Sequence, residues 1–128
     1  MSTKTETLAL ALQHHRAGRI QQAEQLYRSI LQAGSTDPQV WCYLGTAQLA
    51  LGQPAQAEAS YHQAIAIAQQ QSAKLWELRA ATSLAQLWLD RGKRAEARDL
   101  LAPVCGWFTE GFGMPVLQDA MTLLEELV

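Results

Sequence analysis

The sequence predicts an all-α fold, a solenoid in which pairs of helices stack in one direction. Hydrophobic residues make up 48% of the 128-residue chain and aromatic residues only 7%. Alanine, leucine and glutamine, which favour helices, are its commonest residues, whereas the β-branched residues that strands prefer are scarce. A glycine that is followed five residues later by an alanine recurs at Gly18, Gly52 and Gly92. Composition and repetition together indicate a helical repeat protein.

The repeat has a period of 34 residues in its first two copies. Gly52 follows Gly18 by 34 residues, and Tyr61 follows Tyr27 by the same distance. Each glycine lies between two apolar segments, where a helix can end in the left-handed conformation that glycine adopts without strain. The alanine five residues later marks a close approach of two helices. Gly92 follows Gly52 by 40 residues, so six extra residues precede the third copy.

Seven helices follow from the apolar spacing and from helix-start signals. We expect them at 4–17, 20–33, 38–51, 54–70, 73–90, 93–105 and 115–127. Asp37 before Pro38 is typical of a helix start, since aspartate caps free N–H groups and proline fits the first turn. The six extra residues, near 69–74, lengthen the two helices around that turn. Pro103 should end or bend its helix.

The last helix, 115–127, begins at Pro115 and carries an apolar stripe at helical spacing. The end of a repeat stack exposes a core face that a further repeat would have covered. We therefore expect this helix to cap the stack.

The repeat resembles the tetratricopeptide repeat (TPR), a 34-residue helix–turn–helix unit. The second copy matches best, with Trp41, Leu44, Gly45, Gly52, Ala57, Tyr61 and Ala64 at the family's spacings. The first copy has Thr7 in place of the tryptophan, and the third has Leu101 in place of the tyrosine. The resemblance implies a right-handed TPR solenoid in one domain, 1–128. Its parts would be three repeats at about 4–37, 38–71 and 78–111, a linker or extended helix at 72–77, and the capping helix at 115–127.

A narrower likeness lies in the C-terminal half, in the segments 76–85, 100–104 and 106–112. These segments are similar to the last repeat and tail of TPR regions in large bacterial signalling proteins, such as adenylate-cyclase-like and ATPase-like regulators. The catalytic modules of those proteins are absent from this sequence. The likeness therefore implies a detached sensor or scaffold part without their enzymatic activity.

Charge and cysteine content argue against several classes of protein. Ten basic and 12 acidic residues give a net charge of −2, which is unlike the basic character of nucleic-acid-binding domains. Cys42 and Cys105 are too few for a disulfide framework or a zinc site, and favour a reducing compartment. No apolar run is long enough for a signal peptide or a membrane span. We therefore expect a cytoplasmic protein with no nucleic-acid or membrane partner.

No pattern in the sequence is typical of catalysis or of metal binding. His14 and His15 are neighbours, and on a helix neighbouring side chains point about 100° apart. No acidic or cysteine residue nearby completes a metal site with them. We expect His14 to pack between helices and His15 to face solvent or a groove. The basic cluster 91–98 is interleaved with acidic residues that largely neutralise it. The sequence thus predicts neither an enzyme nor a cofactor.

The TPR resemblance places the first helix of each repeat along a concave groove, where family members mostly bind peptides or helices. The groove candidates are Leu8, Leu12, His15, Arg16, Gln39, Cys42, Tyr43, Thr46, Leu49, Arg79, Thr82, Gln86 and Leu89. Thr5, Ala9, Ala50, Ser83 and Asp90 face the same way. The family's terminal-carboxylate clamp needs Lys and Asn where Leu8 and Leu12 stand, so we do not expect that clamp. The apolar members favour an amphipathic helix or a hydrophobic peptide. A homo-oligomer, with a second copy in the groove, is the alternative.

A second candidate surface precedes and opens the last helix. It consists of Trp107, Phe108, Phe112, Met114 and Val116. Aromatic residues in such a glycine-punctuated loop either fold back on the third repeat or form a contact surface. Folding back is the favoured interpretation, but the apolar residues on both sides of Pro115 also favour contact with another chain.

Overall fold

The computed structural model describes residues 4–127, and within them it contains seven helices and no strand. The helices are α1 (Lys4–Arg16), α2 (Ile20–Gln32), α3 (Pro38–Ala50), α4 (Pro54–Gln70), α5 (Lys74–Asp90), α6 (Arg94–Trp107) and α7 (Pro115–Leu127). All seven expected helices are present, with bounds within two residues of the predicted ones. Residues 1–3 and 128 of the expected domain lie outside the described part of the chain.

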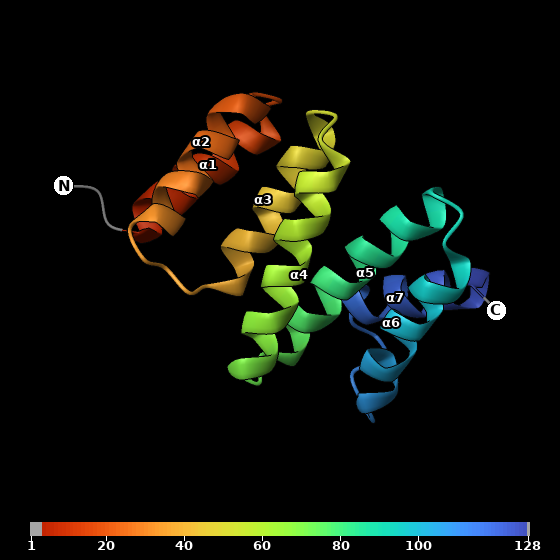
Figure 1. Cartoon of the computed structure of the whole chain (residues 1–128). Helices are drawn as coiled ribbons and strands as arrows, with labels where there is room; N and C mark the ends of the chain where they lie inside the picture. The colour runs from red at the N-terminus through yellow and green to blue at the C-terminus, as the bar shows by residue number, and fades with distance from the viewer. Residues whose placement is uncertain (1–3, 128) are drawn as a thin grey trace.

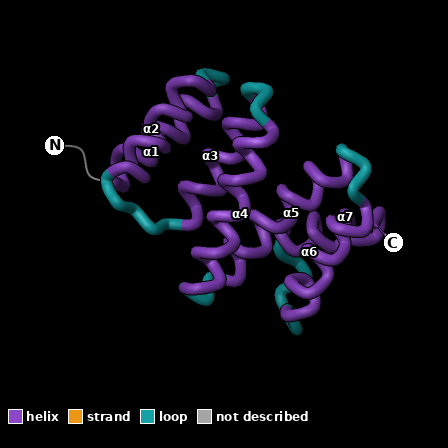
Figure 2. The backbone as a smooth tube through the Cα atoms, viewed as in Figure 1, coloured by secondary structure: helices purple, strands orange, loops and turns teal. Residues whose placement is uncertain are grey.

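The first six helices form three successive hairpins, α1/α2, α3/α4 and α5/α6, and the two termini lie at opposite ends of the stack (Figures 1 and 2). Each helix packs against the next, and α3 also packs against α5. Helix α7 contacts both α5 and α6, so it occupies the place that the first helix of a further repeat would take. The fold is an all-α repeat solenoid with a C-terminal capping helix, as the sequence predicts.

Three glycine turns end a helix in the same way, and a fourth turn, described below, does so without glycine. Gly18, Gly52 and Gly92 have positive φ angles of 84°, 76° and 79°, which confirms the predicted left-handed conformation. At the first of these turns Gly18 N–H donates to His15 O, and Arg19 N–H donates to His14 O at 2.9 Å, the two bonds of a Schellman motif. No neighbouring atom would touch a side chain at the three glycines. The backbone conformation therefore selects glycine there.

The six extra residues lengthen α4 and α5 to 17 residues each, against 13 for α1, α2 and α3. The turn between the two long helices carries Ser72 with φ 55°, in the place that glycine takes in the other turns. Ala73 N–H still donates to Ala68 O at 2.8 Å. The same helix ending is therefore kept without glycine, at the cost of a conformation that side chains rarely adopt.

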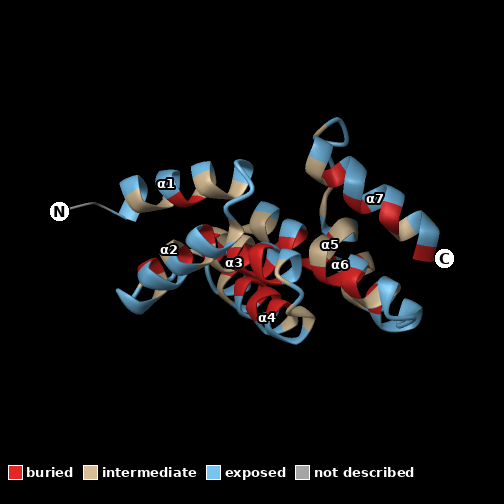
Figure 3. Cartoon of the chain, turned by 90° about the horizontal axis from the view of Figure 1, so that it is seen from above, coloured by how far each residue is buried: buried red, intermediate tan, exposed pale blue. Residues whose placement is uncertain are grey.

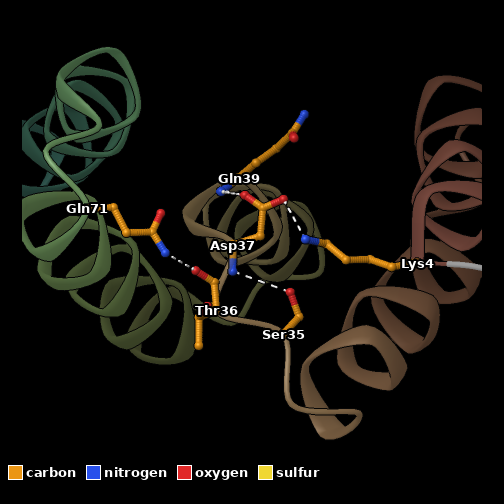
Figure 4. A network of polar contacts seen from close by, with 6 residues as sticks. All are labelled: Lys4, Ser35, Thr36, Asp37, Gln39 and Gln71. Atoms are coloured by element: carbon orange, nitrogen blue, oxygen red, sulfur yellow. Dashed lines mark hydrogen bonds and ion pairs between the residues drawn. The ribbon is translucent and has the colours of Figure 1, made fainter.

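The loop before α3 is tied to three helices (Figure 4). The Asp37 carboxylate accepts a hydrogen bond from Gln39 N–H at 3.0 Å and pairs with Lys4 Nζ at 3.2 Å. The Gln71 side chain donates to Thr36 O at 2.7 Å. The predicted cap is confirmed, and the same carboxylate also connects the start of α1 to the start of α3.

Small residues allow the helices of each hairpin to cross closely. Ala23, Ala57 and Ala97, the alanines of the repeat, are each 0% exposed. At Gly45 an added Cβ would lie 2.8 Å from Tyr61 Cε1, because the Tyr61 ring packs on the α3 backbone. Buried residues line the inner faces of α3 to α7, whereas α1 buries little (Figure 3). Glycine, alanine and an aromatic residue thus form one packing unit.

Pro103 does not end its helix, which excludes one of the two effects expected of it, and the expected bend stays a prediction. Helix α6 continues through Pro103 to Trp107, and Phe108 leaves it with an extended backbone. The proline is exposed, so its ring lies on the outer face of the helix. A proline there removes one backbone hydrogen bond from a helix that is already held by its buried face, on which Ala97, Leu101 and Val104 lie.

Candidate peptide-binding groove

A hollow of about 340 Å³ lies where α1, α3 and α5 meet. Its lining residues are Leu12, His15 and Arg16 from α1, Cys42, Tyr43 and Thr46 from α3, and Arg79 and Ser83 from α5. The first helix of every hairpin therefore contributes, and all eight residues were expected to face the groove. We call this hollow the groove.

The remaining candidates lie around the groove or away from it. Thr82 lines an adjacent hollow together with Arg79, Ser83, Val116 and Asp119. Leu8 and Leu89 are half-buried and pack against the hydrophobic core clusters. Gln39 is half-buried beside the Asp37 cap, Leu49 is 40% exposed, and exposed Gln86 donates to the Asp90 carboxylate at 3.0 Å. The hollow is therefore less apolar than the sequence pattern suggests.

An aromatic row joins the three hairpins at the groove. His15 Nδ1 is 3.0 Å from the Tyr27 hydroxyl, and the Tyr27 and Tyr43 rings stack with centroids 6.1 Å apart. The Tyr43 and Trp76 rings are inclined at 72° with centroids 5.9 Å apart, and the Arg79 guanidinium lies 5.1 Å from the centroid of the Trp76 ring. His15 and Arg79 thus lie at opposite ends of this row, and each is held by contact with an aromatic ring.

The buried tyrosines of the repeat, Tyr27 and Tyr61, support the groove from beneath, because their hydroxyls contact its lining residues His15 and Thr46. Tyr61 and Thr46 hydroxyls are 3.1 Å apart, and Thr46 also donates to Cys42 O at 3.1 Å. Burial raises the pKa of Tyr27 to about 12 and also raises the pKa of Tyr61, so both hydroxyls stay protonated at neutral pH. Sequence reasoning missed Tyr27 and Trp76 as supports, because their positions depend on contacts across helices.

Burial also decides the chemistry of the two reactive side chains in the groove. It raises the pKa of the Cys42 thiol to about 11, so the thiol is protonated and a poor nucleophile at neutral pH. Burial lowers the pKa of His15, which favours the neutral imidazole. His14 was expected between helices; it is half-buried in the last turn of α1 and accepts a hydrogen bond at 2.7 Å from Nε of Arg19, the residue that caps the start of α2. The expectation that His14 packs between helices stays a prediction, and the adjacent His15 is the residue that bonds to a tyrosine of the next helix.

A larger hollow of about 520 Å³ lies between α2, α3 and α4, and no sequence signal pointed to it. Arg28, Trp41, Gln48, Gln56 and Ser60 are among its lining residues. Arg28 Nε is paired with the Glu24 carboxylate at 3.0 Å, and Ser60 is hydrogen bonded to the Gln48 amide at 2.6 Å. The polar groups of this hollow are thus largely satisfied within the chain.

The residues of the second candidate surface divide into two groups. Phe108, Met114 and Val116 are half-buried and pack against the larger core cluster. Trp107 and Phe112 are 57% and 49% exposed. Together with Leu75, several of these residues line a hollow of about 510 Å³. One group therefore folds back on the third hairpin, while the other offers apolar surface to solvent.

Within residues 4–127, no group of three or more His, Cys, Asp or Glu side chains is placed to hold a metal ion, and both cysteines are free. None of the helices in that range is long and apolar enough to cross a membrane.

Two family models match the sequence. One tetratricopeptide repeat model matches residues 14–82, more than half of the chain, and a second matches residues 78–103. The chain belongs to the tetratricopeptide repeat family. Family membership supports a non-enzymatic protein-interaction module. No curated protein matches the sequence, and the likeness to adenylate-cyclase-like regulators stays a prediction.

Solved structures of the same fold cover nearly the whole TPR chain. The type III secretion chaperone SycD of Yersinia enterocolitica, in complex with a peptide of the translocator YopD, has 22% identity and a TM-score of 0.81. That match covers 98% of this chain and 94% of the chaperone chain. BtubC (BKLC) from P. vanneervenii has 17% identity and a TM-score of 0.83, over 97% of this chain and 54% of its own. At these identities the likeness establishes the fold.

Proposed function

We propose that this TPR protein is an interaction module that binds a peptide or an amphipathic helix in the groove between α1, α3 and α5. The observation that carries the proposal is the hollow itself, to which the first helix of each hairpin contributes side chains. Such a surface suits a helix that lays one face along a row of receptor helices. Leu12 and the Tyr43 ring supply apolar contact, and the hydroxyls of Thr46 and Ser83 supply hydrogen bonds.

A related structure supports the same use of the fold. The chaperone SycD was solved in complex with a peptide of the translocator YopD. The proposal takes from it only that a TPR-like stack of this size can hold a peptide. We also propose that this chain is divided into repeats at about 4–37, 38–71 and 78–111. We further propose that it is located in the cytoplasm. The two free cysteines support a reducing compartment.

The test is to fill the hollow with a side chain of the protein itself. Thr46 is exposed at the groove floor, so Thr46→Arg should block the groove and leave the helix intact. Binding of a fluorescent amphipathic peptide of about 16 residues, long enough to form a helix, is measured by anisotropy. We expect Thr46→Arg to weaken binding about tenfold or more.

Thr122→Arg is the matched control, because Thr122 is exposed on α7 and does not line the groove. It should bind the peptide as the wild type does. If both variants bind with wild-type affinity and retain their helical circular dichroism, the peptide does not occupy the groove, and the proposal fails.

Self-assembly is the second candidate function, and the exposed side chains of Leu75, Trp107 and Phe112 favour it. Apolar groups of this size at one end of a small protein are often covered by another molecule. SycD has been solved in an "alternative dimer". Light scattering at high concentration tests the idea, since a strictly monomeric protein would leave only a foreign ligand.

A further inference from the structure

The groove carries positive charge that the chain itself leaves unneutralised. Arg16 comes from α1 and Arg79 from α5, and both line the same hollow. Neither has an ion pair among the described residues, in which Lys4, Arg28, Lys74 and Arg98 each lie within 4 Å of a carboxylate. Two guanidinium groups without an ion pair among the described residues thus line one concave site, one from each side.

No acidic residue lines the groove to offset this charge. The other polar groups of the hollow are His15, Tyr43, Thr46 and Ser83, all of which carry neutral donors or acceptors. Asp119 of α7 lines the adjacent hollow with Arg79, but it forms no ion pair with it. The local field at the groove therefore favours an anionic group.

Arg79 is held in a position that suits recognition of a carboxylate. Its guanidinium lies over the Trp76 ring, and that ring packs edge-on against Tyr43. A guanidinium above an aromatic face keeps the N–H groups at its edge free to donate, and the fork of donors matches the two oxygens of a carboxylate. Less side-chain freedom is then lost when a ligand binds.

The shape of the surface favours a segment that passes through the site over a chain end that stops in it. The groove and the adjacent hollow share Arg79 and Ser83, so Arg79 lies in the middle of a longer trough. Leu12 lines the groove on the α1 side. A ligand that fits both features has an acidic side chain directly beside an apolar stripe.

We propose that the groove recognises a side-chain carboxylate, Asp or Glu, on an amphipathic helix, with Arg16 and Arg79 as the two residues that bind it. This inference rests on the proposed function and specifies its ligand. It differs from the family's terminal-carboxylate clamp, because Leu8 and Leu12 stand where that clamp needs Lys and Asn.

Three fluorescent peptides of about 16 residues, with one shared apolar stripe, test the inference. The first has Glu beside the stripe and an amidated C-terminus, the second has Gln in place of Glu, and the third is the Gln peptide with a free C-terminal carboxylate. We expect the wild-type protein to bind the Glu peptide about tenfold more tightly than either Gln peptide, because one charge-assisted pair is worth about that much. Salt should reduce this preference.

Arg16→Gln and Arg79→Gln should each reduce the preference for the Glu peptide to about twofold or less. Arg91→Gln is the matched control, because Arg91 is exposed, has no ion pair among the described residues and lies in the α5–α6 turn. It removes the same charge and should leave the preference unchanged.

Each contrary outcome has a distinct meaning. Equal binding of the Glu and Gln peptides, or equal loss in Arg91→Gln, overturns the carboxylate inference and leaves the proposed function standing. Tightest binding of the free-carboxylate peptide overturns the choice of a side chain. If none of the three peptides binds, the proposed function fails together with the inference.

Discussion

Some positions of this fold accept only glycine, and the reason differs from one position to another. Gly45 has no room for a side chain because Tyr61 occupies that space, whereas Gly18 has room but needs its left-handed backbone. The sequence pattern shows both as glycines of the repeat and does not separate the two causes. The groove also shows this limit of the sequence pattern. The repeat spacing predicts its eight lining residues, but the bond between His15 and Tyr27 depends on how α1 lies on α2.

Gly45→Ala should destabilise the protein by about 1–3 kcal/mol, because the new Cβ would lie 2.8 Å from Tyr61 Cε1 and the buried ring must shift. Gly106→Ala is the control, since Gly106 lies in α6 with no atom within 4 Å of an added Cβ. Alanine is the better helix former, so that change should stabilise by up to about 1 kcal/mol. Urea unfolding of both variants measures the difference, and equal shifts would contradict the packing argument.

His15 should make stability depend on pH. Burial lowers its pKa in the folded protein below the ordinary value of 6.5, so the unfolded chain binds the proton more readily. The contribution of neutral His15 to the free energy of unfolding is therefore fully present above about pH 6.5. It is lost as the pH falls from that value through the lower pKa of the folded protein. In urea titrations over this range, His15→Gln should lose less stability on acidification than the wild type. An identical pH profile would show that His15 is not the group concerned.

Individual helices were predictable where their ends carry a local signal. Asp37 and Pro38 mark the start of α3, and the glycine turns mark the ends of α1, α3 and α5. Pro103 did not reveal whether α6 would continue, because the rule for proline is local, whereas the persistence of α6 depends on the burial of Leu101 and Val104 in the tertiary core. Packing against neighbouring helices therefore overrides a single unfavourable residue.

The stability of the α3/α4 hairpin should depend on side-chain size at the alanine where the two helices cross, and not at a nearby exposed alanine. Ala57 is 0% exposed within the hairpin, whereas Ala55, two residues earlier on α4, is exposed. Ala57→Leu should lower stability by about 1–3 kcal/mol through overpacking, and Ala55→Leu should change it little. Thermal unfolding of the two variants compares them, and equal melting temperatures would show that this alanine does not set the helix separation.

The stack as a whole is unequal at its two ends. The hydrophobic core divides into a smaller cluster built from α1, α2 and α3 and a larger one that extends from α3 to α7. At the C-terminal end α7 buries Leu117, Ala120, Leu123 and Leu127, whereas at the N-terminal end α1 buries Ala11 alone. The sequence shows the capping helix through its apolar stripe. It does not show that Leu10, the counterpart of buried Leu44, is 45% exposed, because exposure depends on how neighbouring helices pack.

This asymmetry predicts that the N-terminal helix opens first. In a repeat stack each unit is stabilised mainly by its neighbours, so a terminal helix with few buried contacts opens at low free energy. The backbone amides of α1 should therefore exchange with deuterium faster than those of α5, which buries seven residues and packs against α3, α4, α6 and α7. Peptide-resolved hydrogen exchange measures this, and α7, the other terminal helix, is the internal control. Because α7 buries four residues, its protection should exceed that of α1. A ligand seated in the groove would contact Leu12 and Arg16 of α1 and should slow exchange there more than in α7. Equal protection in α1 and α5 without ligand would mean that the stack opens as one unit, in spite of its divided core.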